Sequence, residues 1–123
     1  MAKLSYSTVG SNKLEEAKAF FDELLSSIGM EALFEHPSGG RIYTGDAGLF
    51  GVLGPHDGKA ATVGNGSMTG FSFDTREEVD AFYKKALELG GTDEGAPGER
   101  GPKAYFAYFR DLDGNKFCAY KFG

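Results

Sequence analysis

Hydrophobic residues recur at intervals of three or four in two segments of the chain. This spacing places them on one face of a helix, so each segment is predicted to form an amphipathic helix with one buried side. The positions are Leu14, Ala17, Phe21, Leu24 and Ile28 in the first segment, and Val79, Phe82, Ala86 and Leu89 in the second.

The ends of both helices carry recognisable signals. Asn12 and Asp74 are residue types that cap helix N-termini, and each is followed three positions later by Glu. A side-chain oxygen at the cap can accept a hydrogen bond from a backbone N–H that the helix leaves unpaired. Gly29 and the pair at 90–91 are expected to end the helices, because glycine readily adopts the left-handed conformation.

The two helical segments belong to an internal repeat. A shift of 62 positions superimposes Asn12, Glu15, Glu16, Ala19, Phe20, Phe21 and Leu25 on Asp74, Glu77, Glu78, Ala81, Phe82, Tyr83 and Leu87. A strand-like run precedes each helix, at 4–9 and 68–73, and glycine-punctuated runs follow at 32–35, 41–44, 49–53, 104–110 and 116–122. A further strand near 92–94 is weakly signalled and could be irregular. The pattern predicts an α+β fold of two tandem βαβββ modules.

We expect one domain, with the first module at 1–55, a connecting loop at 56–67 and the second module at 68–123. Alone, a module of about 60 residues would be only marginally stable, because little of its surface can be buried. The two are therefore predicted to pair edge to edge into a cupped mixed sheet, with the helices on its outer face.

Composition and charge restrict the kinds of partner that the protein is expected to bind. The chain has 123 residues, 41% of them hydrophobic and 25% charged, which is typical of a globular domain. The net charge is −5, and no basic cluster exceeds Lys84 and Lys85, which argues against a nucleic-acid partner and favours a cationic ligand. No apolar run is long enough to span a membrane or to resemble a signal peptide, so we expect a cytoplasmic protein without membrane contact.

This module pattern, together with the segments 64–67 (Gly-Asn-Gly-Ser) and 104–116, resembles the vicinal oxygen chelate superfamily. That superfamily includes glyoxalase I, bleomycin-resistance proteins, fosfomycin-resistance transferases and extradiol dioxygenases. The most specific element is the turn at 111–115, which is similar to the family pattern Asp-Pro-Asp-Gly-Asn with Leu112 at the proline position. The resemblance implies the cupped fold and, since small members are commonly dimers, a homodimer. Sites of such dimers often draw on both chains, and the sequence leaves open whether the site here does.

Family enzymes bind a divalent metal through His on the first strand of each module and Glu on the last. The resemblance assigns these positions to Tyr6, Gly51, Met68 and Cys118. A neutral phenol, a thioether and a glycine are poor ligands for hard cations, and one thiol cannot hold a metal alone. We therefore expect no metal and no other cofactor, and no metal-dependent dioxygenase activity.

Side chains in phase with these positions are expected to line the cup, because alternate residues of a strand point to the same side. The sequence does not determine the register of the last hairpin, so it leaves open whether Tyr105 or Tyr108 faces the cup. We include Tyr105 among the expected ligand-binding residues. The expected ligand-binding residues are Tyr6, Thr8, Leu49, Gly51, Met68, Gly70, Tyr105, Cys118 and Tyr120.

A cup lined in this way predicts binding of a small, partly apolar or aromatic molecule, as in the bleomycin-resistance proteins. An alternative is a glyoxalase-like lyase or isomerase that uses another metal, or Cys118 and Tyr6 as acid–base groups. A third reading is that side chains fill the cup, which would leave the protein a structural or interaction role. The sequence leaves open whether the chain is an enzyme.

Overall fold

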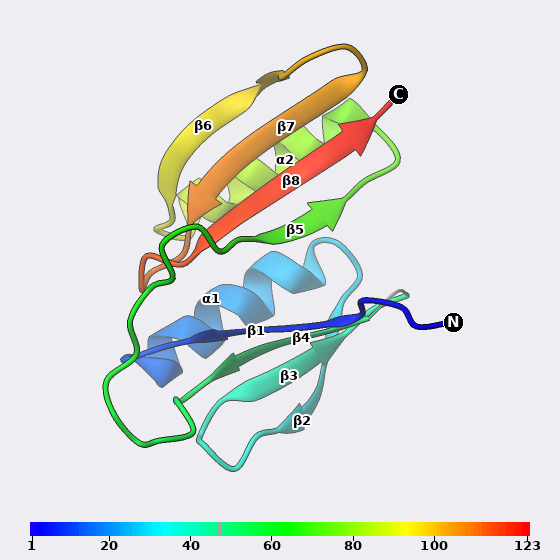
Figure 1. Ribbon diagram of the computed structural model, residues 1–123. Coiled ribbons are helices and arrows are strands. Elements are labelled where there is room, and N and C mark those ends of the chain that lie inside the picture. The colour runs from blue at the N-terminus through cyan, green and yellow to red at the C-terminus, as the bar shows by residue number, and fades with distance from the viewer. Residues whose placement is uncertain (47) are drawn as a thin grey trace. The chain divides into compact units, whose positions relative to one another are not determined.

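The computed structural model describes residues 1–46 and 48–123 (Figure 1). The chain divides into two compact units, Met1–Val63 and Gly64–Gly123. Unit one contains β1 (Tyr6–Gly10), α1 (Leu14–Ser26), β2 (Glu31–Glu35), β3 (Arg41–Thr44) and β4 (Leu49–Leu53). Its strands form one sheet in the order β1-β4-β3-β2, in which β1 runs parallel to β4 and the other neighbours are antiparallel.

Unit two repeats this arrangement. It contains β5 (Thr69–Ser72), α2 (Arg76–Glu88), β6 (Thr92–Glu99), β7 (Ala104–Arg110) and β8 (Lys116–Phe122). The strand order is β5-β8-β7-β6, with β5 parallel to β8. The predicted α+β class and the tandem βαβββ modules are thus confirmed.

Four strands differ in extent from the predictions. β1 spans Tyr6–Gly10 instead of 4–9, and β2 spans Glu31–Glu35 instead of 32–35. β5 begins at Thr69, so Met68 precedes the strand rather than opening it. The weakly signalled strand near 92–94 extends to Glu99 and carries register shifts on both sides of Gly95. Pairing with β7 outweighs the poor strand propensity of the glycines in this segment.

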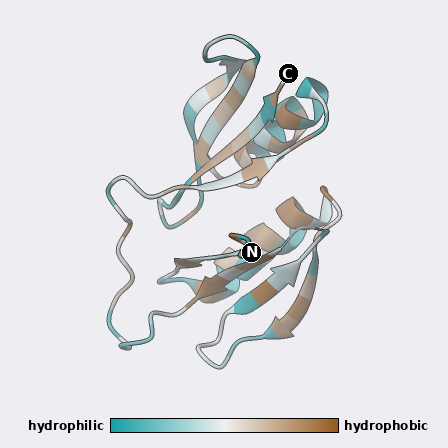
Figure 2. Cartoon of the chain, turned by 45° about the vertical axis from the view of Figure 1, so that its right-hand side comes forward, coloured by the Kyte–Doolittle hydropathy of each residue, from teal (hydrophilic) through white to brown (hydrophobic). Residues whose placement is uncertain are grey.

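Each helix covers one face of the sheet of its own unit, and hydrophobic and hydrophilic residues alternate along the elements (Figure 2). In unit one, the ring of Phe21 on α1 packs against Phe50 on β4 at a centroid distance of 5.0 Å. In unit two, Phe82 on α2 packs against Phe71 at 5.2 Å and against Phe109 at 5.7 Å. These rings form the two cores.

The N-cap of α2 is Thr75, not Asp74 as predicted. The Thr75 hydroxyl accepts a hydrogen bond from the backbone N–H of Glu78, and the Glu78 carboxylate accepts one from the backbone N–H of Thr75. This reciprocal capping box needs Glu three positions after the cap, and Glu78 meets that spacing from Thr75.

The prediction for α1 is also wrong, because Lys13 occupies the N-cap position and no side chain caps the helix. The Asn12 side chain instead pairs with Ala61 of the connecting segment. Its amide donates to the Ala61 carbonyl at 2.9 Å, and its oxygen accepts from the Ala61 N–H at 2.7 Å. The side-chain oxygen of Asn12, which the local pattern had predicted to cap α1, is thus bonded to the backbone of Ala61, 49 positions away.

The predicted helix ends are confirmed at Gly29 and Gly90, which have φ values of 84° and 106°. Beyond these glycines the chain bonds back to the last turn, as in the N–H of Met30 donating to the Leu25 carbonyl at 3.0 Å. Among the described residues, no helix has the length and apolar character needed to cross a membrane.

Candidate functional site

Three of the predicted ligand-binding residues of unit two, Gly70, Cys118 and Tyr120, lie on the side of the sheet that faces away from α2. Cys118 on β8 lies between Gly70 on β5 and Tyr108 on β7 in the strand register. Cross-strand partners point to the same side of a sheet. We call this surface the helix-free face of unit two, formed by Gly70, Phe106, Tyr108, Cys118, Tyr120 and Phe122.

Tyr105 does not belong to the helix-free face, which corrects the prediction of its position. Its hydroxyl donates to the Asp80 carboxylate of α2 at 2.6 Å, and the Arg76 guanidinium lies over its ring. The bond to Asp80 raises the pKa of Tyr105. Tyr108 lies three residues further along β7, so its side chain points to the opposite side of the strand, on the helix-free face. The physical cause is the hairpin register, which pairs Tyr108 with Cys118.

The helix-free face of unit two carries a cluster of aromatic rings. The Phe106 ring stacks on Tyr120 at a centroid distance of 5.1 Å and an interplanar angle of 13°, and lies 5.9 Å from Tyr108. Phe122 extends the cluster and is 65% exposed. Sequence reasoning did not single out Phe106, although the alternation from Tyr108 along β7 would have identified it once the hairpin register was known.

Cys118, on the same face of the sheet as this cluster, carries a buried thiol. The residue is 2% exposed, and burial raises its pKa to about 11, although the charge of Lys116 acts in the opposite direction. A Cβ at Gly70 would lie 3.0 Å from the sulfur, so the absence of a side chain at Gly70 leaves room for the thiol. At neutral pH the thiol is protonated and is a weak nucleophile.

Two cations lie next to the ring of Tyr108. The Arg100 guanidinium carbon is 5.8 Å from the ring centroid, and the Lys116 ammonium nitrogen is 5.2 Å from it. Both distances are within the range of cation–π attraction. The helix-free face therefore combines aromatic surface with positive charge.

In unit one, the other predicted residues also come together on the side away from α1. The register pairs Tyr6 with Leu49 and Thr8 with Gly51 on the adjacent strands β1 and β4. A Cβ at Gly51 would contact the Thr8 methyl group at 3.3 Å. Tyr6 is 54% exposed, whereas Phe50, in the opposite phase of β4, packs against α1.

The sequence profile of the Glyoxalase/Bleomycin resistance protein/Dioxygenase superfamily matches residues 3–119. The chain belongs to this superfamily. A solved glyoxalase/bleomycin resistance protein from Albidiferax ferrireducens T118 is 42% identical to it, with a TM-score of 0.88 over 97% of this chain and 98% of that chain. Among curated protein sequences, no significant match is found.

Two more distant structures share the superfamily fold. A glyoxalase/bleomycin resistance protein/dioxygenase family enzyme from Burkholderia phytofirmans PsJN is 21% identical, with a TM-score of 0.76 over 97% of this chain and 98% of that chain. A lactoylglutathione lyase from Agrobacterium tumefaciens is 16% identical, with a TM-score of 0.73 over 98% of this chain and 93% of that chain.

The metal site that the superfamily resemblance implies does not fit the donor groups of this member. Gly51 has no ligand atom, and a Cβ there would lie 2.6 Å from Cδ1 of the buried Ile42, so the position has no room for the family's glutamate. Met68 offers a thioether and Cys118 a buried, protonated thiol. Within the parts of the chain that the structure describes, no group of three or more His, Cys, Asp or Glu side chains could hold a metal ion.

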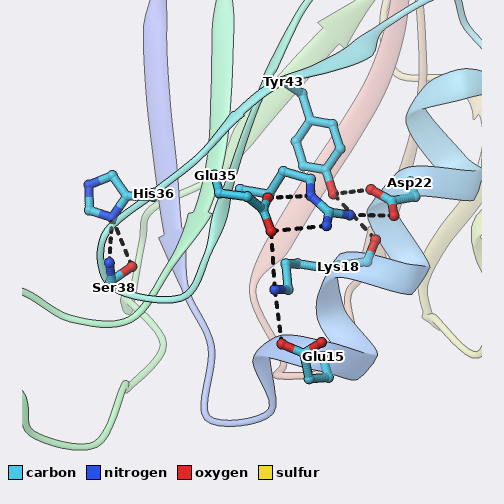
Figure 3. Close-up of polar contacts among 8 residues, drawn as sticks. Glu15, Lys18, Asp22, Glu35, His36, Ser38 and Tyr43 are labelled. Atoms are coloured by element: carbon cyan, nitrogen blue, oxygen red, sulfur yellow. Dashed lines mark hydrogen bonds and ion pairs between the residues drawn. The ribbon is translucent and has the colours of Figure 1, made fainter.

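A network of charged residues joins the sheet of unit one to α1 (Figure 3). Arg41 bonds the carboxylates of Asp22 and Glu35, and Lys18 bonds Glu15 at 2.9 Å. The Tyr43 hydroxyl donates to Asp22 at 2.7 Å, and burial raises its pKa. These groups are hydrogen-bonded or ion-paired with one another. The network therefore joins the sheet to α1, and its polar groups are already occupied and not available to a ligand.

Proposed function

We propose that this superfamily member binds a small, partly aromatic molecule on the helix-free face of unit two, without a metal. The observation that carries the proposal is the stack of Phe106 on Tyr120, continued by Phe122, on the side of the sheet opposite to α2. Aromatic surface of this kind binds aromatic ligands by stacking and by excluding water.

The tyrosine hydroxyls support the same proposal. Those of Tyr43 and Tyr105, on the helix sides of the sheets, and of Tyr83, on α2, each donate to an aspartate. Those of Tyr108 and Tyr120 form no hydrogen bond to any residue among 1–46 and 48–123. The helix-free face thus offers two phenol groups that can bond a polar atom of a ligand.

A metal-free mode of binding is supported by the chemistry of the four positions where the superfamily resemblance assigns ligands. The same chemistry disfavours the alternative, a lyase or isomerase that uses Cys118 as an acid–base group. With a pKa of about 11, the thiol holds its proton too tightly to serve as a base near neutral pH. Sequestration of the ligand needs no such group.

The test is a titration with the neutral probe 2-naphthamide, followed by two-dimensional NMR of the labelled chain. We expect shifts in the backbone amides of β7 and β8, and no change on addition of EDTA or of Ni²⁺. Tyr120→Leu should weaken binding, whereas Tyr105→Leu, which removes the same group from the helix side, should not. Absence of shifts at β7 and β8, or shifts that require the metal, would contradict the proposal.

We also propose that the chain forms a homodimer, as small members of the superfamily commonly do. The edge strand β2 supports this, because all five of its residues are exposed and Ala32, Leu33 and Phe34 are apolar. An exposed apolar edge favours association. Sedimentation at micromolar concentration should give the mass of two chains. Leu33→Glu should reduce it to one, and Val63→Glu, at an exposed apolar residue outside the strand, should not.

A further inference from the structure

We propose that the ligand of the helix-free face carries an anionic group, of the aromatic carboxylate class, and that Arg100 and Lys116 bind it. This inference rests on the proposed function and adds the charge of the ligand. It starts from the finding that two cations lie within 6 Å of the centroid of one ring, that of Tyr108.

The Arg100 side chain is held against the sheet by its surroundings on β6. Its guanidinium donates to the carbonyl of Ala96 at 2.7 Å. A Cβ at Gly98 would lie 2.8 Å from one guanidinium nitrogen, and a Cβ at Gly95 would lie 3.3 Å from another. The two glycines leave the space that the guanidinium occupies next to Tyr108.

Lys116 approaches the same ring from the first residue of β8. The register pairs it with Arg110, two residues along β7 from Tyr108 and on the same side of the sheet. Arg110 is already neutralised, since its guanidinium lies 2.9 Å from the Glu94 carboxylate. Among the described residues, no ion pair joins Glu94 to Lys116.

Within the described residues, Arg100 and Lys116 are distinguished by their contact with the same aromatic ring, since surface lysines such as Lys84 also form no ion pair. Lys18, Arg41, Arg76 and Arg110 each form an ion pair with a carboxylate. Among the residues that the structure describes, Arg100 and Lys116 have no carboxylate partner. Two like charges facing one ring repel each other. An anion between or beside them would relieve that repulsion and accept charge-assisted hydrogen bonds.

The proposal is opposite to the cationic ligand expected from the net charge of −5. At physiological salt, charges separated by more than about 8 Å are largely screened. Groups in direct contact with the ligand therefore outweigh the average charge of the surface. The Tyr108 hydroxyl, which can donate to a carboxylate, adds to the preference for an anion.

The experiment compares three naphthalenes that differ in charge: 2-naphthoate, 2-naphthamide and 2-naphthylmethylammonium. Dissociation constants are measured by NMR titration of the full chain at low salt and at 0.5 M NaCl. The variants are Arg100→Gln and Lys116→Gln, with Lys84→Gln on α2 as the control for loss of one positive charge. Amide spectra of each variant verify that the fold is unchanged.

We expect 2-naphthoate to bind about tenfold more tightly than 2-naphthamide, which is the range of a charge-assisted hydrogen bond at a partly hydrated site. Arg100→Gln and Lys116→Gln should each reduce this preference severalfold, high salt should reduce it, and Lys84→Gln should leave it unchanged. Affinity of 2-naphthamide should change little in any variant.

Three results would overturn the inference. Equal affinities for the three probes at β7 and β8 would leave the proposed binding face intact and remove its anion preference. Tighter binding of the ammonium probe would assign the opposite charge to the ligand. Absence of binding by all three probes would refute the proposed function itself, and the inference with it.

Discussion

Gly51 on β4 lies directly across from Ile42 on β3, and a Cβ at Gly51 would lie 2.6 Å from Cδ1 of Ile42. Real Cβ atoms do not approach other atoms so closely, and Ile42 is buried and cannot simply turn into solvent. This contact closes the position where the superfamily resemblance places a metal-binding glutamate.

The first prediction concerns this pair. Gly51→Ala should lower the free energy of unfolding by about 1–3 kcal/mol, because it overpacks a filled site. Ile42→Val alone should cost about 0.5–1.5 kcal/mol. In the double variant the missing Cδ1 makes room for the new methyl group, so its loss should be clearly smaller than the two single losses combined. Denaturant unfolding of the four proteins measures this, and additive losses would show that the contact does not exist.

Cys118 should react slowly with thiol reagents in the folded protein. Its burial and its pKa of about 11 leave little thiolate at pH 8. Relative to the unfolded chain, the rate of reaction with Ellman's reagent should fall by roughly 100-fold or more, since an ordinary thiol has a pKa of about 8.5. Rates measured with and without guanidinium chloride test this. Rapid modification of the native protein would revive the reading in which Cys118 is an acid–base group.

Glu35 should make stability depend on pH in the acid range. Its hydrogen bond with Arg41 lowers its pKa below the ordinary value of 4.5. Because the folded-state pKa lies below the unfolded-state value, Glu35 stabilises the protein above that value, and this contribution is lost as the pH falls through the folded-state pKa.

In urea titrations between pH 7 and pH 2, Glu35→Gln should therefore lose less stability on acidification below about pH 4.5 than the unchanged protein does. Glu31→Gln, on the same strand, serves as the matched control. An identical acid dependence in Glu35→Gln and the unchanged protein would mean that the pair with Arg41 contributes nothing to stability.

Thr75→Ala should lower the free energy of unfolding by about 1 kcal/mol, because it removes the hydroxyl that accepts from the Glu78 N–H. Thr75→Ser keeps that hydroxyl and should retain most of the stability. Asp74→Ala, at the residue that the sequence pattern had favoured, should have a smaller effect than Thr75→Ala. Thermal or urea unfolding of the three variants measures these losses. If Asp74→Ala caused the largest loss in the free energy of unfolding, the assignment of Thr75 as the N-cap of α2 would be wrong.

Met68→Ala should cost under about 1 kcal/mol of stability, because Met68 is 49% exposed and precedes β5. Phe71→Ala, three residues later, removes a ring packed against Phe82 and Phe117 and should cost about 3 kcal/mol or more. Urea unfolding compares them. Equally large losses would indicate that Met68 is packed, in agreement with the reading of a filled cup.

The sequence by itself determined the features that depend on neighbouring residues. The spacing of Leu14, Phe21 and Leu24 identified α1, and the glycines at 29 and 90 marked the helix ends. The repeat identified the tandem βαβββ modules. Periodicity and glycine conformation act within a few residues, so they can be read along the chain.

Only the tertiary structure decided features that depend on distant partners. Whether Tyr105 or Tyr108 joins the helix-free face follows from the pairing of β7 with β8, since a shift of one residue would exchange the two sides of the strand. Asn12 bonds Ala61 and not its own helix because the fold brings that backbone within reach. Arg100 lies over Tyr108 because two glycines of β6 make space there. These relationships arise from register and packing between separate segments, which the local pattern of residues does not encode.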